Sequence, residues 1–500
     1  MRKKLMRVGL FGLGSVVLVS AMMLTSCQKG FDSDETFSSK VTGSQLASPV
    51  LSKANFATLV NSDGSESIKV TWDAVMGAGG YYYRVDNMDS GEPVLLTEGS
   101  TDKSLFLFPK AEDTKYRVTV KTLGNDKLGN TGATEATVFA YSTMIEAQTI
   151  PAGSNIVEFV KANIVDTEDE QAFELVPGAS YTIDSEVDFG RHKVTFRGNK
   201  VDYPIVTMTG QGCIRTAAGL KVKWIKFDCT SQESKGVVEC SSVAFPELET
   251  KKTGWPDKAY YLPDPIIFQD CWFKNVKMCL FFSGARAWAL EDVRIDNCIV
   301  QLDNDGTKFG DAAVIGTYSG TAYYRDDSQT WSSAIRNVTI KNSTIYNLKD
   351  NSKNRMIRFQ SNQLGRVFDS QYGSATLTNN TFIKVMSDKE FANNTPNRVE
   401  YSITFNGNIC YDCWRLQKFM QGNNPLTVDV TKNTIWGLKN AVDATDKTRC
   451  ATEENAFGYA SVDELNTALK ELDLTKPNGG VNFKASGAIS STIGDPRWLQ

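Results

Sequence analysis

The chain has 500 residues, and its 41% hydrophobic and 22% charged residues are typical of globular domains rather than of disordered or collagen-like proteins. This length allows about two to four domains. The formal net charge of −4 argues against a basic nucleic-acid-binding surface, so we expect no nucleic-acid partner. The single histidine, His192, excludes multi-histidine metal sites and leaves one base for Ser-His-Asp chemistry. Because His192 lies between Arg191 and Lys193, we expect it in a surface turn or strand.

Residues 1–26 have the pattern of a secretory signal peptide, with four basic residues before the apolar stretch 8–24. The sequence Leu24-Thr25-Ser26-Cys27 resembles the lipobox of bacterial lipoproteins, which implies that Cys27 becomes lipidated. The acidic run after Cys27 resembles the surface-export signal of Bacteroidota lipoproteins. We therefore expect an outer-membrane, cell-surface protein that is attached to the membrane by its lipid anchor and the tether 27–45, not by a transmembrane helix. Cleavage without lipidation is the alternative.

Residues 46–143 show short alternating strands with turn residues between them, the pattern of an all-β sandwich. Ile68, Val70 and Trp72 fall on one face of a strand, and Tyr116 stands just before a later Val-x-Val strand. A core Trp followed by such a Tyr resembles a fibronectin type III domain, in which Tyr116 would be the tyrosine-corner residue. The resemblance implies a spacer or a partner surface, and we assign this region no chemistry.

Residues 150–440 open with a predicted short amphipathic helix at 155–162. Apolar strands at 173–175 and 181–183 flank a Pro-Gly turn, and a strand at 194–197 ends in Arg-Gly. This order resembles the first coils of pectate-lyase-like right-handed β-helices.

An internal repeat supports the same architecture. Six segments share the frame apolar-x-apolar-x-x-small-x-apolar, where the small residue is Cys, Ser or Asn. Stacked strands about 4.8 Å apart would bury the apolar positions and align the small residues at one corner. Asn380, Asn408 and Asn433 would then form an amide ladder, which Ser343, Cys298 and Cys271 continue. The segments are Ile266–Phe273, Val293–Val300, Val338–Ile345, Ala375–Phe382, Ile403–Cys410 and Val428–Ile435.

The predicted fold class is therefore all-β: a fibronectin type III sandwich followed by a right-handed parallel β-helix. An antiparallel sandwich is the alternative for the second part. Residues 441–500, with a predicted helix over 461–472, would cap the open end of the β-helix. Nearly the whole chain resembles Bacteroidota surface lipoproteins with paired domains of unknown function. That resemblance implies partners among the proteins of a glycan-utilisation system.

The β-helix resemblance implies an acidic polysaccharide as ligand. A lyase needs a cation to neutralise the uronate carboxylate and a base to remove the neighbouring proton. Our catalytic candidates are Arg358, Lys341 and Arg355, because strand parity turns Arg358 and Met356 outward if Ile357 faces the core. The alternative is that these cations are ordinary solvated residues of a β-helix wall.

Candidate substrate-binding residues are Arg286 and the aromatic residues of a long insertion, Tyr323, Tyr324 and Trp331. The segment 303–306, Asp-Asn-Asp-Gly, resembles a calcium loop but lacks the EF-hand glutamate, so calcium stays an open cofactor and no metal site is assigned. The arginine and histidine patterns of pectate lyases are absent. The sequence therefore leaves open a polysaccharide lyase, a non-catalytic glycan-binding protein, and a scaffold or adhesin.

Overall fold

The computed structural model describes two compact units, which divide the chain at Met1–Met144 and Ile145–Gln500. Cys27 and residues 1–26 lie outside the described residues. No helix within the described ranges is long and apolar enough to cross a membrane. The described residues are 42–251, 258–284, 286–304, 313–317, 333–349, 355–358, 367–368, 372–385, 400–413, 426–436, 456–458, 469–484 and 492–499.

The first unit is a sandwich of two antiparallel sheets that share one hydrophobic core. Trp72 is buried in this core and meets Tyr81 edge to face, with ring centroids 5.1 Å apart. The hydroxyl of Tyr116 accepts a hydrogen bond of 2.8 Å from the backbone N–H of Ala111, a few residues upstream. One sheet contains β1 (Phe56–Val60), β2 (Glu66–Thr71) and β5 (Leu105–Pro109). The other contains β4 (Val94–Thr101), β3 (Gly80–Asn87), β6 (Lys115–Leu123) and β7 (Thr137–Ser142). Two short 3-10 helices, η1 (Lys53–Asn55) and η2 (Asp126–Leu128), lie in the same unit.

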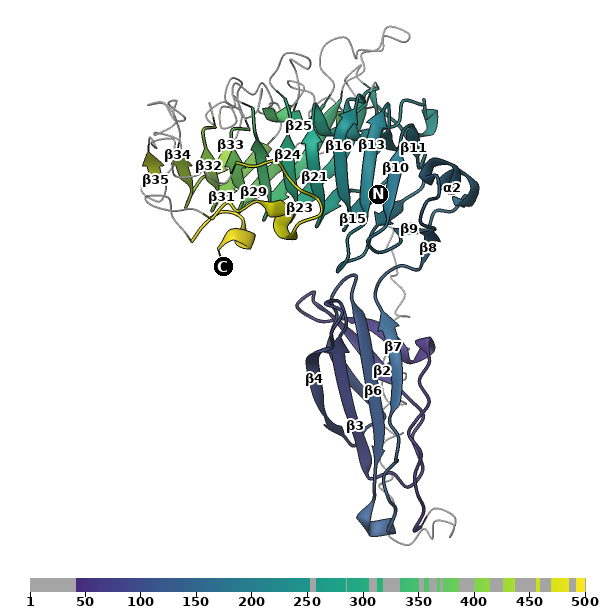
Figure 1. Ribbon diagram of the computed structural model, residues 1–500. Coiled ribbons are helices and arrows are strands. Elements are labelled where there is room, and N and C mark those ends of the chain that lie inside the picture. Colours follow the sequence, from purple (N-terminus) through teal and green to yellow (C-terminus); the bar gives the residue numbers. More distant parts are fainter. Residues whose placement is uncertain are drawn as a thin grey trace, which may run out of the picture. The chain divides into compact units, whose positions relative to one another are not determined.

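The second unit is a solenoid of three sheets, here called A, B and C, whose neighbouring strands are parallel except for the pair β18 and β19. Figure 1 shows the strands stacked one after another along the solenoid. Sheet A contains β8 (Ala147–Ile150), β9 (Gln171–Leu175), β12 (Val194–Arg197), β15 (Leu220–Lys223), β18 (Glu249–Lys251), β19 (Lys258–Leu262), β20 (Ile266–Gln269), β23 (Trp288–Asp296), β26 (Ala334–Lys341), β29 (Tyr372–Thr378), β31 (Glu400–Asn406) and β33 (Leu426–Asp429).

Sheets B and C complete each coil. Sheet B contains β10 (Ser180–Ile183), β13 (Ile205–Gly210), β16 (Lys226–Gln232), β21 (Trp272–Val276), β24 (Ile299–Leu302), β27 (Thr344–Asn347), β30 (Thr381–Ile383), β32 (Ile409–Tyr411), β34 (Thr434–Trp436) and β35 (Ala456–Gly458). Sheet C contains β11 (Glu186–Asp188), β14 (Cys213–Thr216), β17 (Gly236–Cys240), β22 (Cys279–Phe282), β25 (Ala313–Gly316) and β28 (Arg355–Arg358). The all-β class and the parallel stacking of the repeat are thus confirmed.

The helix α2 (Ile156–Asn163) covers the first coil, as the amphipathic pattern predicts. The side chain of Asn155 accepts a hydrogen bond from the N–H of Glu158 and so caps the helix. Ile156 and Val160 are buried in the solenoid core. The helix therefore closes the end of the solenoid where β8 to β11 lie (Figure 1).

The predicted corner ladder is present between sheets A and B. Asn380, Asn408 and Asn433 are at most 1% exposed. The amide oxygen of Asn408 accepts bonds from the backbone N–H (3.0 Å) and the side-chain amide (2.9 Å) of Asn380. Asn433 accepts equivalent bonds from Asn408 at 2.9 and 3.1 Å. The hydroxyl of Ser343 accepts from the N–H of Cys298 at 3.0 Å, so the column continues as predicted.

The C-terminal region differs from the predicted end cap in its described parts. Residues 469–472 of the predicted helix have no helical structure, and 461–468 lie outside the described residues. The segments 469–484 and 492–499, with the 3-10 helices η6 (Pro477–Gly480) and η7 (Pro496–Trp498), lie along the outer side of sheet B. The reason is that this side is apolar and needs cover: Ile299, Tyr346, Ile383, Ile409 and Tyr411 form one cluster with Leu472, Leu474, Val481, Phe483 and Trp498.

Asn408→Leu should destabilise the second unit. The change removes the acceptor for Asn380 and the donor to the carbonyl of Leu377, which Asn408 contacts at 2.8 Å. Each buried group that loses its partner costs about 1–3 kcal/mol. Thr404→Val, on the outer side of strand β31, is the matched control and should unfold like the wild type. Equal denaturant midpoints for Asn408→Leu and wild type would show that the ladder does not stabilise the fold.

Candidate functional site

The outer side of sheet C gathers most of the predicted catalytic cations. Arg355 and Arg358 are partly exposed at the two ends of β28, while Met356 and Ile357 between them are fully buried in the core. The prediction that Met356 points outward is therefore wrong. Two successive residues face the core in this strand, so the outward positions are three residues apart and not two.

One row of outward residues crosses all six strands of sheet C. Strand register aligns Asp188, Arg215, Glu239, Phe282, Gly316 and Arg358 in that order. The guanidinium of Arg215 lies 3.0 Å from Glu186 and 3.5 Å from Glu239, and it donates to the hydroxyl of Ser242 at 2.7 Å. We call Arg215, Lys235, Arg355 and Arg358 the basic face. Arg215, Lys235 and Glu239 were not identified from the sequence.

Glu239 is the least exposed carboxylate of this region, at 6%. Burial raises the pKa of its carboxyl, and the N–H of Gly236 and the charge of Arg215 oppose that rise. The Gly236 N–H donates to the carboxylate at 2.8 Å. A carboxyl group with a raised pKa next to a cation is a candidate for accepting or donating a proton.

Near the centre of the basic face, Gly316 lies against Cys279 and Phe282. A Cβ atom on Gly316 would lie 3.1 Å from the sulfur of Cys279 and 3.7 Å from the ring of Phe282. The Lys235 ammonium lies 5.7 Å from the centre of the same ring. Burial raises the pKa of the Cys279 thiol to about 12, which disfavours its thiolate form.

The remaining predicted residues lie elsewhere. Lys341 is on the outer side of sheet A, where its ammonium pairs with Asp296 at 3.0 Å, so the structure does not place it with Arg358. Arg286 lies in the turn before β23 and donates to the backbone carbonyl of Ser242. Tyr323, Tyr324 and Trp331 lie outside the described residues.

The calcium-like loop is only partly described. Asp303 pairs with Lys349 at 3.6 Å, and residues 305 and 306 lie outside the described residues. Within the ranges that the structure describes, no group of three His, Cys, Asp or Glu side chains could hold a metal ion. We therefore assign no chemical step to calcium.

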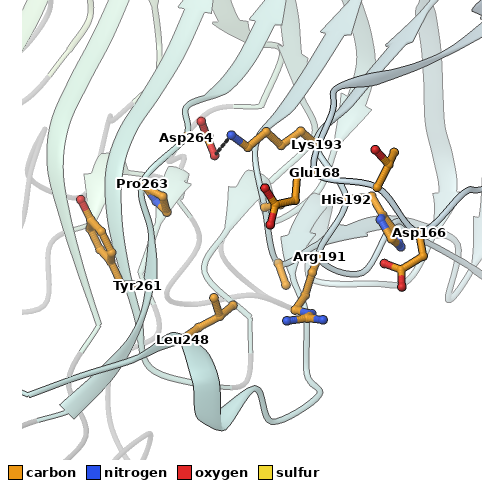
Figure 2. A pocket seen from close by; sticks show the side chains of 12 residues that line it. Asp166, Glu168, Arg191, His192, Lys193, Leu248, Tyr261, Pro263 and Asp264 are labelled. Carbon is orange, nitrogen blue, oxygen red and sulfur yellow. Dashed lines mark ion pairs between the residues drawn. The ribbon is translucent and has the colours of Figure 1, made fainter.

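A cavity of about 460 Å³ lies at the turns between sheets C and A in the first coils. Figure 2 shows Lys193 and Asp264 pointing toward each other, and their charged groups are 3.1 Å apart. Arg191 pairs with Glu247 at 2.8 Å. Both permanent cations of this cavity thus already have carboxylate partners. Its lining residues are Asp166, Thr167, Glu168, Arg191, His192, Lys193, Ala217, Ala218, Leu248, Tyr261, Pro263 and Asp264.

Two family models match the sequence. A domain of unknown function, DUF4992, covers residues 4–180, and a second domain of unknown function, DUF4957, covers residues 179–348. The two family models meet at residues 179–180, after strands β8 and β9 of sheet A. The two structural units, in contrast, separate after residue 144. The first family model therefore includes α2 and β9 together with the sandwich.

Among solved structures, the chain is similar to a PL6 family alginate lyase, AlyGC, with 11% sequence identity and a TM-score of 0.21. A mutant of that lyase gives 12% identity and a TM-score of 0.23. Both matches cover 58% of this chain and 43% of the lyase chain, so this chain spans less than half of the lyase's length. No curated protein shows significant similarity to the sequence.

Glu239→Gln should change how stability depends on pH. Because burial raises the folded-state pKa of Glu239 above 4.5, the folded chain holds this proton more tightly than the unfolded chain. The stability that this proton binding to Glu239 contributes is fully present below the pKa of the carboxyl in the unfolded chain. It is lost as the pH rises through the pKa of the carboxyl in the folded chain. The stability of Glu239→Gln relative to wild type should therefore increase from pH 4 toward pH 7.

Denaturant unfolding at several pH values measures this difference. Glu186→Gln is the control, since it removes a more exposed partner of Arg215. A wild-type-minus-variant difference that stays constant with pH would contradict the raised pKa of Glu239.

Proposed function

We propose that the basic face of sheet C binds an acidic polysaccharide, with lyase-type cleavage as its reaction. The single observation that carries the proposal is the presence of Arg215, Arg355 and Arg358 on one side of sheet C, with Lys235 directly before β17 beside the ring of Phe282. The alternative is a glycan-binding or scaffold protein that uses the same face without a proton transfer.

The geometry suits an extended chain that runs along the solenoid. Arg215 and Arg358 stand four strands apart in one row. At about 4.8 Å per strand this row spans about 19 Å, which is long enough for several sugar units. Arg355 and Arg358 are about 10 Å apart along their strand. Guanidinium groups bind carboxylates through two parallel hydrogen bonds, so this face can hold successive uronates.

Cleavage requires a proton acceptor besides the cations. Arginine is a very poor base because its pKa is above about 12. Glu239 has a raised pKa and lies 3.5 Å from Arg215. We therefore propose that Arg355 and Arg358 bind carboxylates and that Glu239, with Arg215 beside it, transfers the proton. Lys341 takes no part, because it lies on sheet A and pairs with Asp296.

We propose further that the protein is a surface lipoprotein whose first unit is a fibronectin type III module. Support comes from the lipobox ending at Cys27 and from the sandwich itself. The bond from the Ala111 N–H to the Tyr116 hydroxyl has the geometry of a tyrosine corner, and Trp72 is buried in the core as such domains require. For the solenoid we propose a right-handed path, since parallel crossovers are right-handed in about 98% of cases.

Arg358→Ala should weaken binding of an acidic polysaccharide by about tenfold to a hundredfold, the range for one charge-assisted hydrogen-bonded contact. Binding of alginate, polygalacturonate and hyaluronan can be measured by affinity electrophoresis at low and high salt. Cleavage is followed through the ultraviolet absorbance of the unsaturated product. Lys341→Ala is the matched control on sheet A and should bind like the wild type.

The variants separate the two functions. If the protein is a lyase, Glu239→Gln should lower kcat with little change in binding, because a proton acceptor acts in the transition state. Binding without an unsaturated product from any polymer would favour the non-catalytic alternative. Arg358→Ala and Lys341→Ala that bind equally well would refute the basic face as the glycan site.

Cys27→Ala should release the protein from the membrane fraction. Acyl chains contribute about 0.8 kcal/mol per buried CH₂ group, so their loss removes the anchor that the lipobox predicts. Fractionation of cells that express wild type or variant tests the anchor, and protease treatment of whole cells tests surface exposure. Membrane association that persists in the variant would refute lipidation as the anchor.

A further inference from the structure

The outer side of sheet A in its last coils carries rows of small neutral polar side chains. Strand register aligns β26, β29, β31 and β33 so that equivalent positions stand side by side. The core side of the same strands is apolar, with Val338, Ala375 and Ile403 buried. We call the outward rows the hydroxyl face; they are Asn337, Ser374, Ser402 and Thr427, then Thr339, Thr376 and Thr404, then Thr378 and Asn406.

This neutral character is confined to part of the sheet. In earlier coils the row that contains Thr339 holds Lys221 and Arg294, and the row that contains Thr378 holds Lys223 and Asp296. Among the described residues, charges adjoin the hydroxyl face at its border, as Lys341, Asp429 and Glu400, which pairs with Tyr372. A solvated wall ordinarily mixes charges of both signs, so nine contiguous neutral positions indicate a surface with a neutral ligand.

The hydroxyl face offers regularly spaced hydrogen-bonding groups. The hydroxyls of Thr339, Thr376 and Thr404 form no side-chain hydrogen bond within the described residues, and each can donate one bond and accept two. Threonine is restricted at χ1, so these groups are held in place before a ligand arrives. Successive strands are about 4.8 Å apart, close to the length of one sugar unit in an extended polysaccharide.

An aromatic ring stands at one edge of the face. Tyr372 begins β29 and is 54% exposed, with its hydroxyl 3.3 Å from the hydroxyl of Ser402. A tyrosine ring in this position can stack on the apolar side of a sugar while neighbouring hydroxyls bind its edge. Tyr372 is also the only large apolar side chain of the described hydroxyl face that is exposed, so the face lacks the apolar anchors of a protein interface.

We propose that the hydroxyl face binds a neutral polysaccharide chain that lies along the solenoid axis. Its sugars then follow the strand spacing, and Tyr372 contacts one of them. The face contains no cation to hold a uronate, whereas the basic face of sheet C does. The protein therefore has two glycan surfaces of different charge preference on two sheets of one solenoid. The inference is independent of the function proposed for sheet C.

The test compares two variants in affinity electrophoresis with neutral polymers. These are mixed-linkage glucan, galactomannan and hydroxyethyl cellulose, with polygalacturonate as the acidic comparison. Thr376→Val with Thr404→Val removes two hydroxyls while keeping side-chain shape, and should weaken binding of the preferred neutral polymer about tenfold. Tyr372→Ala should weaken it as well. Both variants should retain wild-type melting temperatures, because the changed groups face solvent.

Two control variants distinguish binding at the hydroxyl face from binding at other surfaces. Arg294→Ala changes an outward residue of sheet A outside the hydroxyl face and should leave neutral binding unchanged. Arg358→Ala should also leave neutral binding unchanged, whatever it does to acidic binding. The proposal is overturned if the wild type is retarded by none of the neutral polymers, or if the double threonine variant and Tyr372→Ala are both retarded as strongly as the wild type.

Discussion

The register of stacked coils at the corner between sheets A and B is the constraint on which the second unit depends. At this corner a residue in the left-handed region precedes each small buried side chain: Asn342 and Asn379 have φ of 51° and 55°. The buried amides of Asn380, Asn408 and Asn433 then bond from coil to coil. Because each amide satisfies its neighbour, a coil cannot slip by one residue without leaving buried polar groups without partners.

Because the register is fixed, equivalent residues of successive coils stand side by side in rows, and the outer side of each sheet has its own composition. From β24 to β32, sheet B carries apolar side chains on its outer side as well as in the core, and the C-terminal segments cover them. The Trp498 indole donates to the hydroxyl of Thr344 at 2.7 Å, and that hydroxyl donates to Asp495 at 2.7 Å, so the cover is fixed by polar contacts too. Sheets A and C are polar outside. The chemistry of the solenoid is therefore distributed over its two uncovered sheets, one neutral in its last coils and the other basic.

The sequence predicted the strands of the second unit where a small corner residue marks the position of the repeat. In sheet C, where no corner residue marks it, most strands could not be predicted. Asn380, Asn408 and Asn433 recur at a constant place between apolar positions, so the strands of sheets A and B could be predicted. The strands of sheet C have no such marker. Their inward pairs, such as Leu280 with Phe281 and Met356 with Ile357, break strict alternation. Alternation placed Arg358 correctly but Met356 wrongly.

The cations of the basic face illustrate the same limit. Arg215 and Arg358 are 143 positions apart in the sequence and share one row only because three strands of sheet C, β17, β22 and β25, stack between theirs. No local pattern around Arg215 or Glu239 signals that they share a surface with Arg358. Lys341 was chosen because it points outward from the preceding segment, but that segment belongs to sheet A. A sequence repeat thus predicts which residues point outward. It predicts less readily which sheet those residues belong to.

The same stacking explains how the second unit keeps buried cysteines without cross-links. Cys271 and Cys298 occupy the corner position of successive coils, fully buried, and no cysteine among the described residues forms a disulfide. Stacked side chains at this corner point the same way and stand about 4.8 Å apart, whereas a disulfide needs Cβ atoms about 3.5–4.5 Å apart and turned toward each other. Burial also raises the pKa of the Cys298 thiol well above its ordinary value, which suppresses the reactive thiolate. Cysteine therefore acts here as a small core residue, in the place that serine and asparagine take in later coils.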